Sequence, residues 1–161
     1  MQLLKIYYAY FSPGNTTEKV VSHIASSFQN YPVESINLTD YATRQEDYYF
    51  KENELLIIGV PAYGGRVPAP VVDALRHFTG SNTPVVLVAT YGNRDIDDTL
   101  IELKKNVIDK GFIPVGAASF VCQHTFLKEC AEGRPDEEDL KMAGEFGDKL
   151  KERLRLLVTY D

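Results

Sequence analysis

The sequence predicts an α/β fold: a doubly wound parallel sheet of five strands, in the order 2-1-3-4-5, with helices on both faces. Apolar segments that suit strands alternate along the chain with segments of helical spacing, which is the pattern of right-handed βαβ units. Segment 55–60 is a continuous apolar run without alternation, as burial on both faces of a parallel sheet produces. Segment 33–38 is polar, and segment 112–121 contains a proline that cannot donate to a ladder, so these two suit the edges.

The strands are expected at 3–10, 33–38, 55–60, 85–90 and 112–121. The first and fourth are apolar runs; the first ends in a turn of small residues, and Pro84 opens the fourth. The connection 39–53 is charged and rich in tyrosine, and the sequence leaves open whether part of it is helical. No internal repeat or linker is visible, so we expect a single domain over residues 1–161.

Four helices are expected between and after these strands. The first follows Thr16, where apolar residues recur at helical spacing up to Phe28. The second begins near Pro68 or Pro70 and stops at Gly80, as the usual proline and glycine positions indicate. The third runs from about Ile96 to Lys110, with acids at its start and lysines toward its end. The last begins at Pro135, and one apolar stripe marks it: Leu140, Ala143, Gly147, Leu150, Leu154 and Leu157.

Composition excludes several classes of protein. The net charge is −6, which argues against nucleic acid as a partner, because its phosphates select basic surfaces. The chain shows no apolar run of about 20 residues and no signal peptide, so we expect no membrane association and a cytoplasmic location. Two cysteines provide no disulfide framework. An acidic surface would instead guide docking to a basic protein partner.

The segment 10–17 joins the first strand to the first helix through small residues rich in hydroxyl groups. The first N–H groups of a helix have no intrahelical acceptor and the helix dipole is positive there, so such a turn can bind a phosphate without lysine or arginine. Side chains of the same types also serve as N-caps, and this segment alone does not separate the two interpretations. The candidate anion-binding residues are Ser12, Pro13, Gly14, Asn15, Thr16 and Thr17.

Two further unusual loops follow the third and fourth strands. In the order 2-1-3-4-5 the chain reverses between strands one and three, and ligands bind at the carboxyl ends of the strands beside this point. Both loops join tyrosine to glycine and arginine, which suits a flat aromatic ligand with a phosphorylated tail. Surface tyrosines and turn glycines are the alternative for each loop alone. The candidate residues are Pro61, Ala62, Tyr63, Gly64, Gly65 and Arg66, together with Thr90, Tyr91, Gly92, Asn93 and Arg94.

These motifs carry a family resemblance that covers essentially the whole chain. Segment 12–17 resembles the phosphate loop of flavodoxins, and segments 63–66 and 91–94 resemble their two isoalloxazine loops. With 59–68 and 133–136, the closest resemblance is to the flavodoxin domain of flavodoxin–ferredoxin fusion proteins, here without the cysteine-rich ferredoxin part. The loops lack the tryptophan that many flavodoxins stack on the ring, since the chain has none.

The resemblance implies a flavodoxin-like fold and noncovalently bound flavin mononucleotide (FMN). It implies a low-potential electron carrier that serves separate redox partner proteins, with the monomer favoured. The phosphate would lie on residues 12–17, Tyr63 and Tyr91 would contact the ring, and the Gly64–Gly65 region would supply a hydrogen bond at N5 of the ring. Arg66 and Arg94 would either raise the second-electron potential or be surface charges.

Other interpretations remain open. An FMN-dependent NAD(P)H:quinone or flavin reductase is the alternative function, and a flavin-binding regulatory module is a third. Cys122, His124 and Cys130 are zinc ligands by type, but no fourth ligand is marked and their spacing matches no common site. Buried thiols and a loop histidine are the favoured interpretation, although His124 could face a partner or substrate near the flavin.

Overall fold

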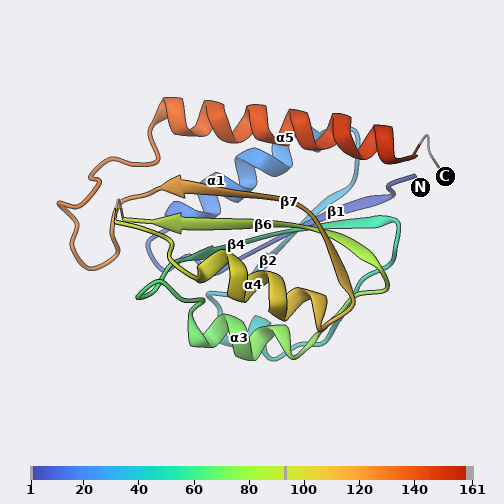
Figure 1. Ribbon diagram of the computed structural model, residues 1–161, viewed down its shortest axis with the longest axis horizontal. Helices are drawn as coiled ribbons and strands as arrows, with labels where there is room; N and C mark the ends of the chain where they lie inside the picture. The colour runs from blue at the N-terminus through green and yellow to red at the C-terminus, as the bar shows by residue number, and fades with distance from the viewer. Residues whose placement is uncertain (1, 93, 159–161) are drawn as a thin grey trace.

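A parallel sheet of five long strands forms the centre of the computed structural model, which describes residues 2–92 and 94–158. The strands are β1 (Lys5–Tyr10), β2 (Val33–Asn37), β4 (Glu54–Pro61), β6 (Thr83–Tyr91) and β7 (Phe112–Val121). Their spatial order is β2-β1-β4-β6-β7, and every neighbouring pair is parallel. Counted by the five long strands alone, this is the predicted order 2-1-3-4-5 (Figure 1).

Helices cover both faces of the sheet. Helix α1 (Thr16–Ala25), the short 3-10 turn η1 (Ser26–Phe28) and helix α5 (Glu137–Val158) pack on one face, and α3 (Ala69–Leu75) and α4 (Thr99–Ile108) on the other (Figure 1). Two buried apolar clusters result, one on each face. Within the described ranges, none of the helices has both the length and the apolar composition needed to cross a bilayer.

The connection 39–53 contains the short helix α2 (Tyr41–Arg44) and a two-residue strand, β3 (Tyr48–Tyr49). Strand β3 pairs with β5 (Phe78–Thr79), a segment that the sequence predicted as the end of a helix. That prediction is wrong for residues 76–80, because α3 ends at Leu75 and Phe78 is fully buried from a strand, with its ring 5.4 Å from that of Phe50. The spacing of Phe78 from the preceding apolar residues is compatible with a helix as well as with a strand.

Two helix starts and two strand starts also differ from the prediction by two residues or more. Helix α4 begins at Thr99 rather than near Ile96, because the Asp95 carboxylate accepts the N–H of Ile96 at 2.7 Å and holds a turn there. Helix α5 begins at Glu137, where Asp136 and Asp139 each accept the other's N–H at 2.9 Å, the reciprocal pattern of a capping box. Strand β1 begins at residue 5 instead of 3, and strand β6 begins at residue 83 instead of 85, so Pro84 is its second residue.

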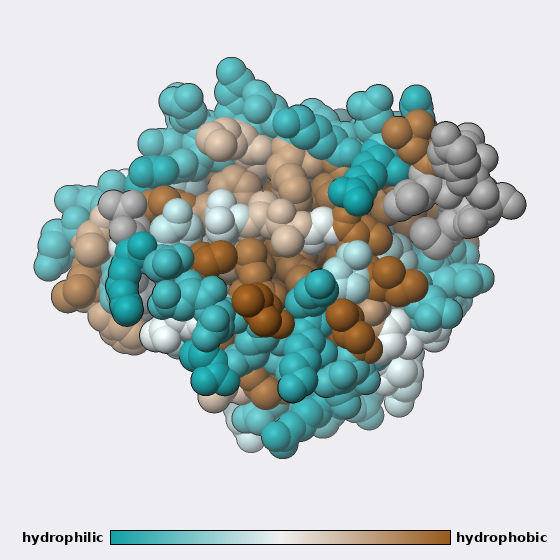
Figure 2. Space-filling view, viewed as in Figure 1, coloured by the Kyte–Doolittle hydropathy of each residue, from teal (hydrophilic) through white to brown (hydrophobic). Residues whose placement is uncertain are grey.

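Both edges of the sheet are the predicted strands. Four of the five residues of β2 are exposed, which fits its polar composition. In β7 the register shifts opposite Val85 and Val86, next to Pro114, so the proline lies at an irregular point of an edge strand. Figure 2 shows the molecule from the same side as Figure 1. On the surface that faces the viewer, an apolar band crosses the middle, with hydrophilic residues above and below it.

Candidate functional site

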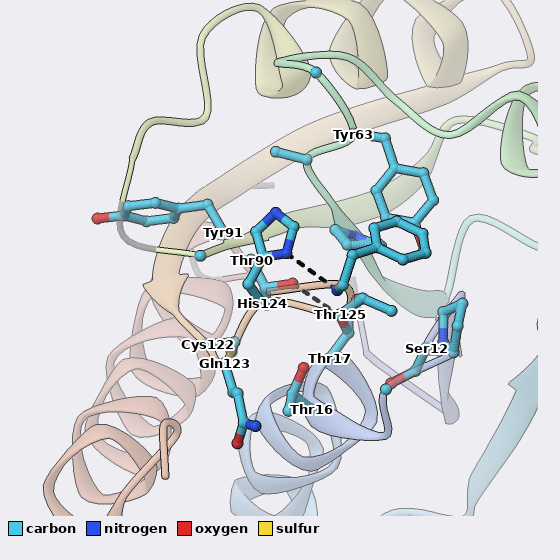
Figure 3. A pocket seen from close by; sticks show the side chains of 17 residues that line it. Ser12, Thr16, Thr17, Tyr63, Thr90, Tyr91, Cys122, Gln123, His124 and Thr125 are labelled. Atoms are coloured by element: carbon cyan, nitrogen blue, oxygen red, sulfur yellow. Dashed lines mark hydrogen bonds between the residues drawn. The ribbon is translucent and has the colours of Figure 1, made fainter. Parts of the chain in front are cut away.

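A cavity of about 130 Å³ lies at the carboxyl ends of β1, β4, β6 and β7 (Figure 3). The lining residues come from the four segments that follow these strands, at the edge where the switch-point rule places ligands. They are Ser12, Pro13, Gly14, Thr16, Thr17, Pro61, Ala62, Tyr63, Gly64, Thr90, Tyr91, Gly92, Cys122, Gln123, His124, Thr125 and Phe126. The structure thus brings together twelve of the seventeen predicted site residues.

The turn 12–17 leads from β1 into α1, and its hydroxyl groups organise the turn itself. The buried Ser12 Oγ accepts the N–H of Glu18 at 3.0 Å, and its carbonyl accepts the N–H of Asn15 at 3.0 Å. Asn15 occupies the N-cap position with a positive φ of 64°, but its side chain forms no capping hydrogen bond. Capping by the Asn15 side chain therefore does not explain this segment. Thr16 and Thr17 belong to the first helical turn, whose N–H groups have no intrahelical acceptor.

Two threonines join this turn to the end of β6. Thr17 and Thr90 are both almost fully buried, and their hydroxyl oxygens lie 2.8 Å apart. Cys122 lies nearby, and burial raises the pKa of its thiol to about 12, although the neighbouring Thr16 and Thr90 hydroxyls act in the opposite direction. Cys122 therefore remains a neutral thiol in the physiological range.

The loop after β4 is a tight hairpin. Tyr63 and Arg66 exchange both backbone hydrogen bonds, at 2.9 and 3.0 Å, around a two-residue turn. Gly64 and Gly65 have φ values of 57° and 76°, and a turn of this kind requires positive φ at both central residues. A Cβ on Gly65 would come within 2.5 Å of Asp97, whereas one on Gly64 would meet nothing within 4 Å. Gly65 thus fixes the hairpin against the next loop, and Gly64 faces the cavity.

Four of the predicted residues that the structure describes do not line the cavity, and a fifth, Asn93, lies outside the described residues. Asn15 is exposed, and Gly65 packs against Asp97. Arg66 points to α4, where its guanidinium pairs with the Glu102 carboxylate, which also accepts the N–H of Val67 at 3.1 Å. The exposed Arg94 lies 3.9 Å from Asp97.

The two tyrosines of the site are arranged differently. The Tyr63 ring packs between Phe11 and Phe126, with centroid distances of 6.1 and 6.3 Å, and burial raises the pKa of its hydroxyl. In Figure 3 the Tyr91 ring points away from Tyr63, and His124 lies between the two. The aromatic group facing Tyr63 across the cavity is therefore supplied by the loop after β7.

The sequence analysis did not include residues 122–126 among the cofactor-binding residues, although it noted that His124 could face a partner or substrate near the flavin. The backbone of Cys122 continues the sheet, donating its N–H to the Tyr91 carbonyl at 2.8 Å. His124 then accepts the N–H groups of Phe126 and Leu127 with Nδ1, at 3.1 and 2.9 Å, so its proton resides on Nε2. The predicted strand order could have indicated this loop, because it follows a parallel strand and therefore leaves the same edge of the sheet as the other three loops.

An ion pair ties down the end of this loop. The Arg134 guanidinium binds the nearly buried Asp139 carboxylate with two hydrogen bonds, one of them 2.7 Å long between Nη2 and Oδ1. These bonds hold the pKa of Asp139 below its usual value. The Arg134 carbonyl in turn accepts the N–H of Gln123 at 2.8 Å. The end of the loop that joins α5 is therefore held in place.

Cys122, His124 and Cys130 do not form a candidate metal centre in this geometry. Over the described ranges, no three residues of the types histidine, cysteine, aspartate and glutamate are grouped so that they could hold a metal ion. His124 Nδ1 is already an acceptor for two backbone groups, and Cys122 is a buried thiol.

The comparisons with known proteins establish the fold. No protein-family profile and no curated protein sequence matches the chain. Solved structures do: a flavodoxin from the domain Archaea has 14% identity over 94% of this chain and 99% of that chain, with a TM-score of 0.65. Flavodoxin 2 of Bacillus cereus has 16% identity over 92% and 99%, with a TM-score of 0.63. Rubredoxin oxygen:oxidoreductase of Desulfovibrio gigas has 14% identity and a TM-score of 0.67, with 96% of this chain covering 37% of that one.

The architecture and these matches together define a flavodoxin-like α/β fold. At identities of 14 to 16%, the likeness concerns the fold, and the function has to be argued from the site of this chain.

Proposed function

We propose that this chain binds FMN and carries single electrons between redox partner proteins. The observation that supports the proposal is the convergence of the turn 12–17 with the loops after β4 and β6 on one cavity. A turn at a helix N-terminus suits a phosphate, and the two loops suit the ring of the same ligand. Bound FMN supplies the one-electron chemistry, while the protein binds, orients and shields it.

The donors at one end of the cavity fit a phosphate. Thr16 and Thr17 present N–H groups of the first turn of α1, where the helix dipole favours an anion. The Ser12 hydroxyl uses its oxygen as an acceptor for Glu18, which leaves its proton for a ligand. The lining residues that the structure describes include neither lysine nor arginine. Such a neutral site gives no cationic stabilisation to a reduced, anionic ring, which favours a low potential.

The other end of the cavity has walls that fit a flat ring. Residues 61–64 form one wall and Tyr91 with Gly92 the other, and Tyr63 can lie against a ring between them. The cavity of about 130 Å³ is smaller than the roughly 300 Å³ at which ligand pockets usually begin. Residues 124–126 account for the difference, because they lie across the space between the two walls.

The proposed partners are separate redox proteins, as the resemblance to the flavodoxin domain of fused proteins implies. The net charge of −6 favours partners with a basic surface, since opposite charges speed their encounter. Beside the cavity mouth, Phe126 and Leu127 are 76% and 53% exposed, which offers such a partner an apolar contact next to the ring.

The proposal is tested by recording visible spectra of the FMN-loaded protein during stepwise anaerobic reduction. Reduction in two separate one-electron steps, without steady NAD(P)H oxidation by the protein alone, is the result expected of a carrier. Steady NAD(P)H oxidation would favour the reductase instead. A colourless protein that takes up no added FMN would refute flavin binding.

Matched variants test the phosphate end. Thr16→Asp places a carboxylate in the cavity, and we expect it to weaken FMN binding about tenfold or more, equivalent to 1.4 kcal/mol, while riboflavin binding changes less. Ser26→Asp adds the same charge on the exposed surface at the other end of α1 and serves as the control. Equal losses for FMN and riboflavin in Thr16→Asp would contradict the placement of the phosphate.

A further inference from the structure

The loop after β7 places its own side chains where the proposed function puts the flavin ring. We call residues 123–130 the cap segment. Its His124 ring packs on Gly92, where a Cβ would come within 2.7 Å of the ring. Its Thr125 Oγ1 lies 3.7 Å from the position of a Cβ on Gly14, in the turn 12–17. Its Phe126 ring lies 6.3 Å from that of Tyr63. The three tip residues thus touch all three loops of the site, and Figure 3 shows two of them, His124 and Thr125, in the cavity.

The hydrogen bonds of the cap segment are mostly internal. His124 Nδ1 accepts two N–H groups of the next three residues, the His124 N–H binds the Cys130 carbonyl at 3.0 Å, and the Cys130 N–H binds the Leu127 carbonyl at 2.8 Å. The ends of the loop are held separately, by Arg134 with Asp139 and by Cys122 with Tyr91. Residues 124–130 of the cap segment can therefore move as a unit without losing these bonds, whereas Gln123, whose N–H binds the Arg134 carbonyl, stays with the fixed part of the loop.

The tip contacts with the rest of the site are weak by comparison. The Thr125 side chain opposes the rise in the pKa of the Tyr63 hydroxyl that burial causes, and the remaining contacts are ring and van der Waals contacts. Phe126 stays 76% exposed, so closure buries little of this apolar side chain. A closed cap held by few bonds is readily displaced by a ligand that fills the same space.

We propose that the cap segment occupies the ring site through His124, Thr125 and Phe126, and that a flat ring binds only after the cap has withdrawn. This inference rests on the proposed function. The fraction of open chains then sets the apparent affinity for any ring-containing ligand, because binding requires the open form. The cap thus determines how tightly and how fast this site takes its ligand.

A disulfide lock tests the proposal directly. The Cβ position of Gly14 lies 3.7 Å from Oγ1 of Thr125, the atom that a cysteine sulfur would replace, so the pair Gly14→Cys and Thr125→Cys brings two thiols within reach of each other. The double variant is made in a Cys130→Ser background, because Cys130 is partly accessible in the same loop, whereas Cys122 is buried. FMN and riboflavin binding are measured by quenching of flavin fluorescence in the oxidised and reduced double variant. The Cys130→Ser chain with the same oxidant is the control.

Oxidation of the double variant is expected to weaken binding of both flavins about a hundredfold or more, and reduction to restore it. Equal affinities in the two states would overturn the proposal, and so would failure of the disulfide to form under oxidising conditions. The proposed function fails separately, if the wild-type chain binds no FMN. The cap is then judged without flavin, by nuclear Overhauser contacts between the His124 ring and the Gly92 Hα protons, whose absence would overturn its closed position.

A milder pair of variants covers the case in which the lock disturbs folding. Thr125→Ala removes the hydroxyl that interacts with Tyr63 and contacts the Gly14 position, and we expect FMN to associate about fivefold faster, the factor that corresponds to one net polar interaction of hydrogen-bond strength. Thr125→Ser keeps the hydroxyl and should associate at the wild-type rate. The same rate for all three chains in stopped-flow fluorescence would contradict the cap.

Discussion

The His124 ring lies against Gly92, where a Cβ would approach its Cδ2 atom to 2.7 Å. Only a residue without a side chain allows this contact between the loops after β6 and β7. A Cβ on Gly92 would also lie 2.9 Å from the His124 Cβ, so rotation of the ring alone does not relieve the clash and the surface loop has to shift; we expect a stability loss of about 1 kcal/mol and a displaced imidazole. Chemical shifts of the His124 ring protons check this.

Gly14→Ala is the matched control for the position of the cap segment. A Cβ at this position meets only Thr125 Oγ1, at an ordinary contact distance of 3.7 Å. The His124 signals should therefore stay at their wild-type positions in Gly14→Ala and move in Gly92→Ala. The same shifts in both variants would mean that the His124–Gly92 contact is not specific.

The buried hydroxyl pair of Thr17 and Thr90 gives a second prediction. Thr90→Val leaves the Thr17 hydroxyl without this partner at a buried position, so a loss of about 1–3 kcal/mol is expected in urea unfolding. The double variant Thr17→Val/Thr90→Val should lose less than the sum of the two single losses, because no unpaired hydroxyl of this pair remains. Additive losses would show that the 2.8 Å contact contributes nothing.

The sequence was sufficient for the strand order because its signals are local. The apolar run 55–60, the polar strand at 33–37 and Pro114 each report the surroundings of one segment, and together they determine the centre and the edges of the sheet. Phe78 was misassigned because its burial comes from a distant aromatic partner, Phe50, which no local period reveals.

The site was predicted in part for the same reason. Turns rich in glycine and hydroxyl groups are visible locally, and twelve of their residues line the cavity. The cap segment has no such pattern, and its role depends on contacts with Gly14, Tyr63 and Gly92, far away in the sequence. The direction of Arg66 depends likewise on Glu102 in α4.

Gly59 provides a third prediction, on how α1 is held beside the site. A Cβ on Gly59 would lie 2.3 Å from Cγ1 of Val21 and 3.1 Å from Cγ2 of Thr17, so α1 packs directly on the backbone of β4. Gly59→Ala should cost about 1–3 kcal/mol in unfolding free energy through overpacking. Gly144→Ala, in α5 with open space around it, is the control and should stabilise the chain by about 0.5–1 kcal/mol. A neutral Gly59→Ala would mean that the helix can shift.

The Arg134–Asp139 pair predicts that the end of the loop beside α5 loses stability in acid. Because the hydrogen bonds from Arg134 lower the pKa of Asp139 in the folded chain, the pair stabilises the fold fully above the unfolded value of 3.8. That contribution is lost as the pH falls through the lower folded value. Asp139→Asn should therefore cost about 1–2 kcal/mol at pH 7, and its difference from wild type should shrink below pH 4. A difference independent of pH in urea unfolding between pH 3 and 7 would contradict this.

Gly64 gives the prediction that bears most directly on the ring site. Its φ of 57° is unfavourable for valine, so Gly64→Val must change the backbone of the hairpin at the cavity wall. If this backbone presents a carbonyl to N5 of the ring, that carbonyl favours the form reduced by one electron, and valine should make the first-electron potential of the FMN-loaded protein more negative. Asparagine tolerates positive φ, so Gly64→Asn should keep a potential close to that of wild type. The measurement is a redox titration of the wild-type chain, Gly64→Val and Gly64→Asn. An unchanged first-electron potential in Gly64→Val would refute the N5 assignment. Equal shifts in both variants would assign the effect to the added side chain instead of the backbone.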